Sequence, residues 1–94
     1  MFRVVIQPGA AEQIRRLPRV DAVTIVAAIE THLRHEPERT TRSRIKRLRG
    51  KQDVTYRLRV GEYRVFYDVR DGRVIVTAVL HKRETAGFYR EEPG

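Results

Sequence analysis

The strongest strand pattern in this chain is "TYRLRVGEYRVFYDVRDGRVIVTAVLH", residues 55–81. Apolar and polar side chains alternate along it with the period of two that is typical of strands with one buried face. Two-residue turn signals, Gly61-Glu62 and Asp71-Gly72, interrupt the alternation, and such pairs form tight II′ and I′ hairpin turns. We therefore predict three consecutive antiparallel strands, over residues 54–60, 63–70 and 73–81.

Turn length also fixes which residues of neighbouring strands lie opposite each other. Across the first turn the predicted pairs are Val60–Tyr63, Arg59–Arg64 and Arg57–Phe66. Across the second turn they are Arg70–Arg73, Arg64–Val79 and Glu62–His81. One face of the sheet then carries Val, Leu, Tyr and Ala side chains that helices can cover. The other face is predicted to gather Arg57, Arg59, Arg64, Phe66, Thr77, Val79 and, at its rim, His81.

The predicted pairing of Arg59 with Arg64 is unusual for a sheet. Like charges directly opposite are destabilising, and favourable cross-strand pairs contribute only about 0.2–1 kcal/mol each. An anionic ligand bound over Arg57, Arg59 and Arg64 would account for the arrangement. The alternatives are that a carboxylate such as Glu62 or Asp68 neutralises the cluster, or that a β-bulge changes the register and scatters the arginines.

The first half of the chain supplies the remaining elements. The predicted ones are a strand over residues 2–7 and helices over 10–17 and 21–34. Asp21 is the expected N-cap of the second helix. The basic segment 36–50 is predicted as a loop with a short extended end at Ile45 and Leu48.

Together these elements predict one small α+β domain, residues 1–94, in the order β-α-α-β-β-β with a short C-terminal segment. We expect a mainly antiparallel four-stranded sheet, with the N-terminal helical hairpin packed on one of its faces.

Positive charge is the strongest signal in the composition. The formal net charge is +8, the isoelectric point is near 10.8, and 34% of the residues are charged. Residues 39–64 hold ten Lys or Arg against two acids, an excess of +8 that equals the net charge of the whole chain. Such a surface favours a polyanionic partner, either nucleic acid or an acidic protein that masks it.

Other classes of protein are disfavoured. The chain has no cysteine, which excludes disulfides, thiolate nucleophiles and Cys-based zinc sites, and its three histidines are too scattered to predict a metal site. We expect no cofactor. The longest apolar run, residues 25–29, is far shorter than a membrane span of about 20 residues, and the N-terminus does not resemble a signal peptide. We expect a cytoplasmic protein.

An arginine cluster suits RNA cleavage without a metal, in which the 2′-OH of the substrate attacks the adjacent phosphate. Guanidinium groups bind two phosphate oxygens at once and stay charged. Proton acceptors and donors are also needed, and aromatic rings can hold an unstacked base. The candidate rings are Phe66, Phe88 and Tyr89, although each could instead fill the core, which is the favoured interpretation for Phe88.

Three segments resemble the RelE branch of the RelE/ParE toxin superfamily: "KRLRG" (46–50), "YRLRVGEYRVFYDV" (56–69) and "HKRETAGFY" (81–89). The resemblance extends over essentially the whole chain. It implies the toxin of a type II toxin–antitoxin pair, a ribosome-dependent endoribonuclease that cuts mRNA in the A site and leaves a 2′,3′-cyclic phosphate. It also implies a cognate antitoxin that silences the toxin.

The resemblance assigns roles to particular residues. The paired basic residues fall on Arg57 and Arg59, the phosphate-binding arginine on Arg64, and the later basic residue and tyrosine on Arg83 and Tyr89. Further RNA-binding candidates are Lys46, Arg47, Arg49, Lys51 and Lys82. RelE carries lysines where this chain has Arg57 and Arg59, and arginine does not serve as a base. Proton transfer therefore falls to Tyr89, His81 or Glu84.

Two other functions remain open. A ParE-like toxin, which inhibits DNA gyrase without enzymatic activity, shares the fold and the basic character. A plain RNA-binding module would show salt-dependent RNA binding and no cleavage.

Overall fold

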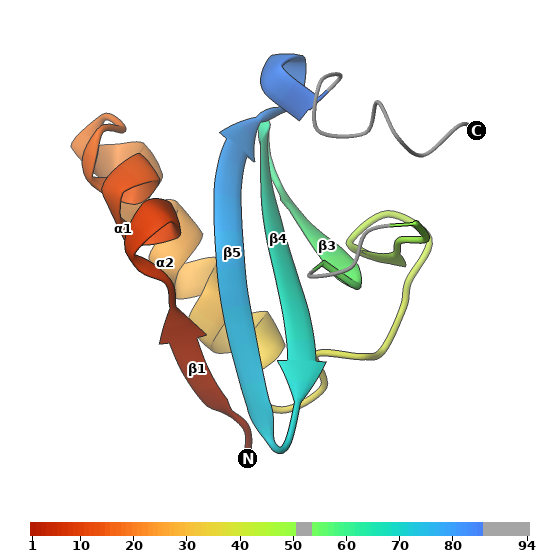
Figure 1. The fold of residues 1–94 in the computed structure, drawn as a ribbon. Coiled ribbons are helices and arrows are strands. Elements are labelled where there is room, and N and C mark those ends of the chain that lie inside the picture. The colour runs from red at the N-terminus through yellow and green to blue at the C-terminus, as the bar shows by residue number, and fades with distance from the viewer. Residues whose placement is uncertain (51–53, 86–94) are drawn as a thin grey trace.

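The computed structural model describes residues 1–50 and 54–85. Its elements are β1 (Arg3–Ile6), α1 (Pro8–Arg15), α2 (Arg19–Leu33), β2 (Ile45–Arg47), β3 (Tyr56–Val60), β4 (Tyr63–Arg70), β5 (Arg73–His81) and the 3₁₀ turn η1 (Lys82–Glu84). The strands form one sheet in the order β1-β5-β4-β3-β2, with β1 parallel to β5 and the other neighbours antiparallel (Figure 1). The predicted α+β fold class is confirmed.

The sheet has five strands within the described residues, so the prediction of four was wrong. The added strand is β2, in the segment that we expected to be a loop with only a short extended end at Ile45 and Leu48. Ile45 pairs with Leu58 and Lys46 pairs with Arg57, and Ile45 is buried. A single apolar residue in a basic segment gives no alternation to detect, and the strand exists because β3 offers it a hydrogen-bonding edge.

The helical hairpin covers one face of the sheet, as predicted, but both of its helices begin earlier than expected. α1 starts at Pro8, because proline fits the first helical position with its fixed backbone angle. α2 starts at Arg19, and its N-cap is Pro18, without a side-chain cap. The prediction of Asp21 as N-cap was wrong: its carboxylate instead accepts a hydrogen bond from the hydroxyl of Tyr63, 2.8 Å away.

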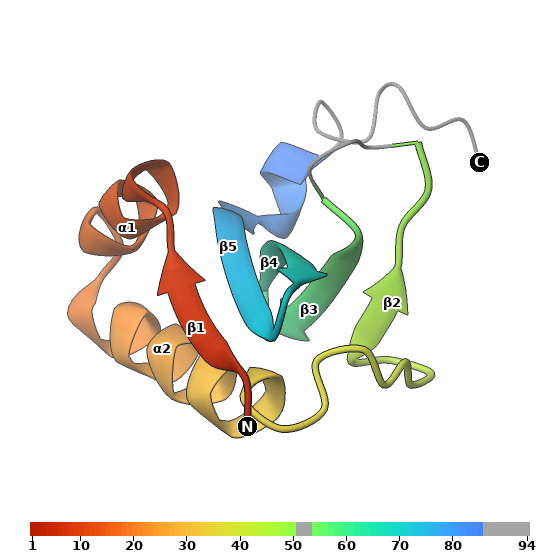
Figure 2. The ribbon, with the colours of Figure 1, turned by 60° about the horizontal axis from the view of Figure 1, so that its bottom comes forward.

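The main core lies between the helices and the sheet (Figure 2). Its fully buried members are Ala10, Ile25, Leu33, Leu58, Val65, Tyr67, Val74 and Val76. Tyr67 stacks on Tyr56 with ring centroids 5.5 Å apart, and its hydroxyl donates to the carbonyl of Pro37 at 2.6 Å. Burial raises the pKa of the Tyr67 hydroxyl, which therefore stays a neutral donor. The central strands are thus a rigid platform, tied to the segment after α2.

A β-bulge changes the register of the second hairpin. Phe66 lies opposite Ala78 but Tyr67 lies opposite Val76, which leaves Thr77 as the extra residue. The hydroxyl of Thr77 donates to the carbonyl of Phe66 at 3.2 Å. Pairing across the first turn is as predicted, and so is the pair Arg70–Arg73.

Past the bulge the predicted pairs were wrong. Arg64 lies opposite Leu80 rather than Val79, and His81 lies opposite Tyr63 rather than Glu62. Val79 therefore packs in the main core, and His81 is turned toward the helix side of the sheet. Because the extra residue is in β5, the arginines of β3 and β4 stay together.

Neither helix in the described part of the chain has the length and apolar character needed to cross a membrane.

Candidate functional site

The face of the sheet away from the helices carries a cationic patch, which we call the arginine face: Lys46, Arg57, Arg59 and Arg64. Arg59 lies directly opposite Arg64 on β3 and β4. Arg57 lies between Lys46 on β2 and Phe66 on β4. The alternation of strand side chains puts all four cations on the same side. The structure thus brings the three predicted arginines together and adds Lys46 to them.

An apolar cluster forms the floor of the arginine face. Val54, Phe66 and Ala78 are buried there, with Leu48 and Leu80 packed against them. Phe66 is 0% exposed, so its ring fills the floor and does not offer a stacking surface. Charges held over an apolar surface are less screened than charges in water, which strengthens their attraction for an anion.

Arg57 is a partly buried cation of the arginine face. Its Nε is buried and has no hydrogen-bond partner among the described residues. A buried donor without a partner costs about 1–3 kcal/mol. Within residues 1–50 and 54–85, Arg57 and Arg59 form no ion pair with a carboxylate. The positive charge at this point is therefore available to an external anion.

Arg64 is oriented by the backbone of the neighbouring turn. Its guanidinium donates to the carbonyls of Gly61 and Tyr63, at 3.0 and 2.9 Å. Gly61 has a positive φ of 56°, which glycine adopts without strain in the predicted two-residue turn. The turn thus sets both the position of Arg64 opposite Arg59 and the direction of its side chain.

The two carboxylates considered as neutralising partners bind other cations. Glu62 forms an ion pair with Lys82 at 3.0 Å, and the pKa of Glu62 is lowered mainly by this partner and less by Arg64. Asp68 forms its ion pair with Arg70 at 2.8 Å. Lys82, a predicted RNA-binding residue, is therefore already paired with an acid.

Asp68 marks the opposite end of the same sheet face. It accepts hydrogen bonds from the hydroxyl of Thr55 at 2.6 Å, from the backbone N–H of Val69 and from the guanidinium of Arg70. Burial opposes its charge, but these hydrogen bonds outweigh burial and hold the pKa of Asp68 below its usual value.

His81 and Arg83 lie at the C-terminal end of β5. The Nδ1 of His81 accepts a hydrogen bond from the backbone N–H of Arg83 at 3.2 Å. The carboxylate of Glu84 accepts one from the backbone N–H of His81 at 2.8 Å. Sequence reasoning missed this capping box, because its known signal begins with Ser, Thr, Asp or Asn, and here the capping residue is His81.

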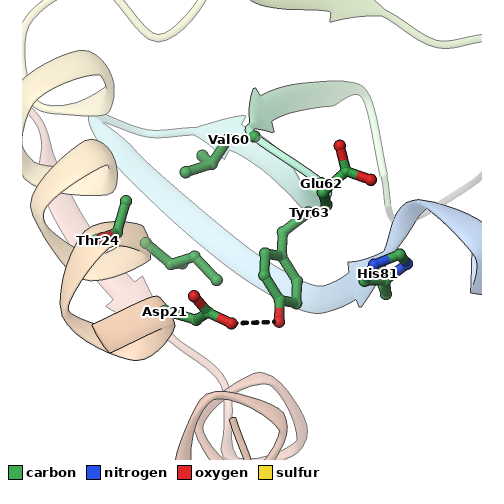
Figure 3. A pocket seen from close by; sticks show the side chains of 8 residues that line it. Asp21, Thr24, Val60, Glu62, Tyr63 and His81 are labelled. Atoms are coloured by element: carbon green, nitrogen blue, oxygen red, sulfur yellow. Dashed lines mark hydrogen bonds between the residues drawn. The ribbon is translucent and has the colours of Figure 1, made fainter. Parts of the chain in front are cut away.

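The imidazole of His81 lines a pocket of about 280 Å³ between α2 and the β3–β4 turn (Figure 3). Its ring meets the ring of Tyr63 edge to face, with centroids 5.4 Å apart. The pKa of Tyr63 is raised, chiefly by its hydrogen bond to Asp21. The structure thus separates His81 from the arginine face, which lies on the other side of the sheet.

The remaining predicted residues are more scattered. Arg47 lies opposite Tyr56, so it alternates to the side away from Lys46. Arg47 and Arg49 line a shallow, polar groove of about 520 Å³ at the end of β2. Lys51, Phe88 and Tyr89 lie outside the described residues. No cluster of three or more potential His or acidic metal ligands occurs in the part of the chain that the structure describes.

Comparison with known proteins agrees with this architecture. A family model, the ParE toxin of type II toxin–antitoxin systems, matches residues 4–86. A candidate toxin, RelE1 of Methanocaldococcus jannaschii, is 35% identical over 86 residues, which are 90% of this chain and 93% of that protein.

Solved structures show the same fold. RelE–RelB of Pyrococcus horikoshii matches with a TM-score of 0.71 and 24% identity, covering 88% of this chain and 97% of the matched chain. RelBE2 of Mycobacterium tuberculosis matches with a TM-score of 0.69 and 26% identity, covering 85% and 96%. Both structures are complexes of a toxin with its antitoxin. The match over residues 4–86, the identity to RelE1 and the shared fold lead to one conclusion: the chain belongs to the RelE/ParE superfamily, as a RelE-like toxin of a type II toxin–antitoxin system.

Proposed function

We propose that this toxin is a ribosome-dependent endoribonuclease that cleaves mRNA in the A site, without a metal, by attack of the substrate's own 2′-OH on the adjacent phosphate. The observation that supports it best is the arginine face, where Arg57 and Arg59 have no carboxylate partner among the described residues. Action on the ribosome would take place in the cytoplasm.

In this proposal the arginines stabilise the phosphate as it gains charge in the transition state. Arg57 and Arg64 bind its non-bridging oxygens through their planar forks, and Arg59 adds a third positive charge. Arg64 is held by two turn carbonyls, so little reorganisation is needed during the reaction. Lys46 lies beside Arg57 and binds the neighbouring phosphate of the chain.

Proton transfer is assigned to Tyr89, because arginine keeps its protons. His81 and Glu84 were the other candidates, and the capping box occupies Nδ1 of the one and Oε1 of the other. Arg83 supplies a further positive charge from η1.

Mapping mRNA 5′ ends in cells after induction tests the proposal. Wild-type toxin should give new ends inside codons, and Arg57→Ala should lower their yield by roughly 10²–10³-fold, as expected for loss of one charge-stabilising group. The matched control is Arg73→Ala, an exposed arginine at the other end of the same sheet, which should cut like wild type. Equal cutting by Arg57→Ala and wild type would exclude the arginine face from the reaction.

A second function is favoured by one observation: the matching family model is that of ParE. A ParE-like gyrase inhibitor would leave mRNA intact and break chromosomal DNA, and the same induced cells report both outcomes.

We also propose a cognate antitoxin as the partner, with an acidic, amphipathic segment that suits the net charge of +8. The outer side of α2 offers it an apolar surface, because Val20, Val23 and Val26 are 71%, 59% and 40% exposed. Val23→Asp should weaken neutralisation by the antitoxin and leave mRNA cleavage intact, whereas Thr31→Asp, on the same helix, should change neither. Full neutralisation of Val23→Asp would exclude this surface.

A further inference from the structure

The segment after β5 depends on its cap. η1 has three residues, too few for a helical turn to be stable alone. The backbone N–H of Arg83 is satisfied by Nδ1 of His81, and the carboxylate of Glu84 satisfies the backbone N–H of His81 in return. These two hydrogen bonds fix the direction in which the chain leaves the sheet, and with it the place where Arg83 emerges.

The ring of His81 is itself held from the opposite side. Its edge-to-face contact with Tyr63 continues through the hydroxyl of Tyr63 to the carboxylate of Asp21 on α2 (Figure 3). Lys82 is tied to the β3–β4 turn twice, by its backbone N–H to the carbonyl of Glu62 at 2.7 Å and by its ion pair with the same residue. A chain of contacts therefore runs from the helical hairpin through His81 to η1.

Accepting a hydrogen bond at Nδ1 requires a lone pair on that nitrogen. The capped state is therefore the neutral imidazole with its proton on Nε2. The ring also packs against Tyr63, on the side of the sheet away from the arginine face. A base acting on a ribose hydroxyl must come within hydrogen-bond reach of it, and His81 is turned away from a substrate bound over Arg57 and Arg64.

We propose that His81 is a positioning residue and carries no proton in the reaction: as the neutral cap of η1 it fixes the path of the chain after β5, and so the position from which Arg83 binds the substrate phosphate. This inference rests on the proposed endoribonuclease function, because the role of Arg83 belongs to that function. It replaces the expectation that His81 is a general acid or base.

The cap depends on a hydrogen-bond acceptor in the side chain at position 81. Asparagine, a strong N-cap residue whose side chain carries such an acceptor, should keep the cap closed, whereas alanine should open it.

Cleavage by purified full-length toxin on translating ribosomes separates the two roles. His81→Ala should lower the rate about tenfold through loss of the cap, and His81→Asn should restore it to within about threefold of wild type. Loss of a proton carrier would instead lower both variants alike, by roughly 10²–10⁴-fold. Equal loss in both variants would overturn the proposal and leave the endoribonuclease function standing. Glu84→Gln and Glu84→Ala form a matched pair. The glutamine variant, which can still accept the hydrogen bond from the backbone N–H of His81, should cleave nearly like wild type, and the alanine variant should be slower.

An NMR measurement tests the cap without reference to cleavage. Long-range ¹H–¹⁵N spectra of the full chain should show the Nε2–H tautomer of His81, with the Arg83 amide shifted by its hydrogen bond. The Arg83 amide should lose this shift in His81→Ala and keep it in His81→Asn. An Nδ1–H tautomer would overturn the proposal. If the spectra showed the cap but wild-type toxin left mRNA intact, the proposed endoribonuclease function would be wrong and the capping role of His81 would still hold.

Discussion

On the face of the sheet away from the helices, two arginines lie directly opposite each other at each end. The two ends differ in the groups that contact these arginines. Arg59 faces Arg64 near the first turn, and Arg70 faces Arg73 next to the second. At the second turn Asp68 pairs with Arg70 and is supported by the hydroxyl of Thr55. Such an arrangement stabilises the fold and leaves little positive charge to attract a ligand.

At the first turn, carbonyl oxygens orient Arg64, and the adjacent acid, Glu62, pairs with Lys82. An arginine pair in a sequence therefore does not by itself identify a binding site. Arg70 has a carboxylate partner, whereas Arg59 has none among the described residues, and such partners are visible only in three dimensions. Substitutions that add a carboxylate at one end, or remove one at the other, test this difference.

Lys46→Glu should give Arg57 the carboxylate partner that it lacks among the described residues, because position 46 lies directly opposite Arg57. The new acid would pair with Arg57 and repel phosphate, and mRNA cleavage should fall about 100-fold, as for loss of one charge-stabilising donor. Lys46→Gln removes the charge without adding an acid, so its loss should be clearly smaller. Cleavage assays on ribosomes measure both; equal losses would show that Arg57 does not need its free charge.

Asp68→Asn should destabilise the other end by about 1–3 kcal/mol, the usual cost of disrupting hydrogen bonds to a buried charged group. The pKa of Asp68 is lower in the folded protein, so its contribution is present above the unfolded value of about 3.9 and is lost as pH falls through the folded value. Urea denaturation of both proteins at several pH values should therefore show curves that converge in acid. A constant difference between the curves would contradict this assignment.

Arg59→Gln should raise stability by about 0.2–1 kcal/mol, because it removes a like-charge pair. The gain should shrink in high salt, which screens exposed charges. Arg70→Gln is the matched control and should lower stability, since Arg70 donates to Asp68. Denaturation at two salt concentrations measures both, and a loss of stability in Arg59→Gln would mean that Arg59 already has a compensating partner.

Most of the sheet could be predicted because its turns are two residues long. Gly61 and Asp71-Gly72 adopt the positive φ values of tight turns. Such turns fix the register of the whole first hairpin and of the start of the second hairpin. The alternation in residues 73–81 does not reveal the bulge, since apolar residues occupy both faces on either side of Thr77. With the regular register Ala78 would face the main core, and with the bulge Val79 does. The structure has the bulge, so the larger side chain fills the core.

The site was predictable where it depended on strand pairing and unpredictable where it depended on tertiary contacts. Arg57, Arg59 and Arg64 share a face because of one short turn. The role of Asp21 depends on the hydroxyl of Tyr63, 42 residues away, and no local pattern signals such a contact.

The single extra residue at Thr77 makes the last four positions of β5 exchange sides relative to the rest of the strand. Insertion or deletion of one residue there would turn each of these side chains to the other face of the sheet. Val79 would then leave the core, and the imidazole of His81 would lie on the arginine face. In this fold the length of one strand, rather than any substitution, therefore decides which chemical groups can share a surface.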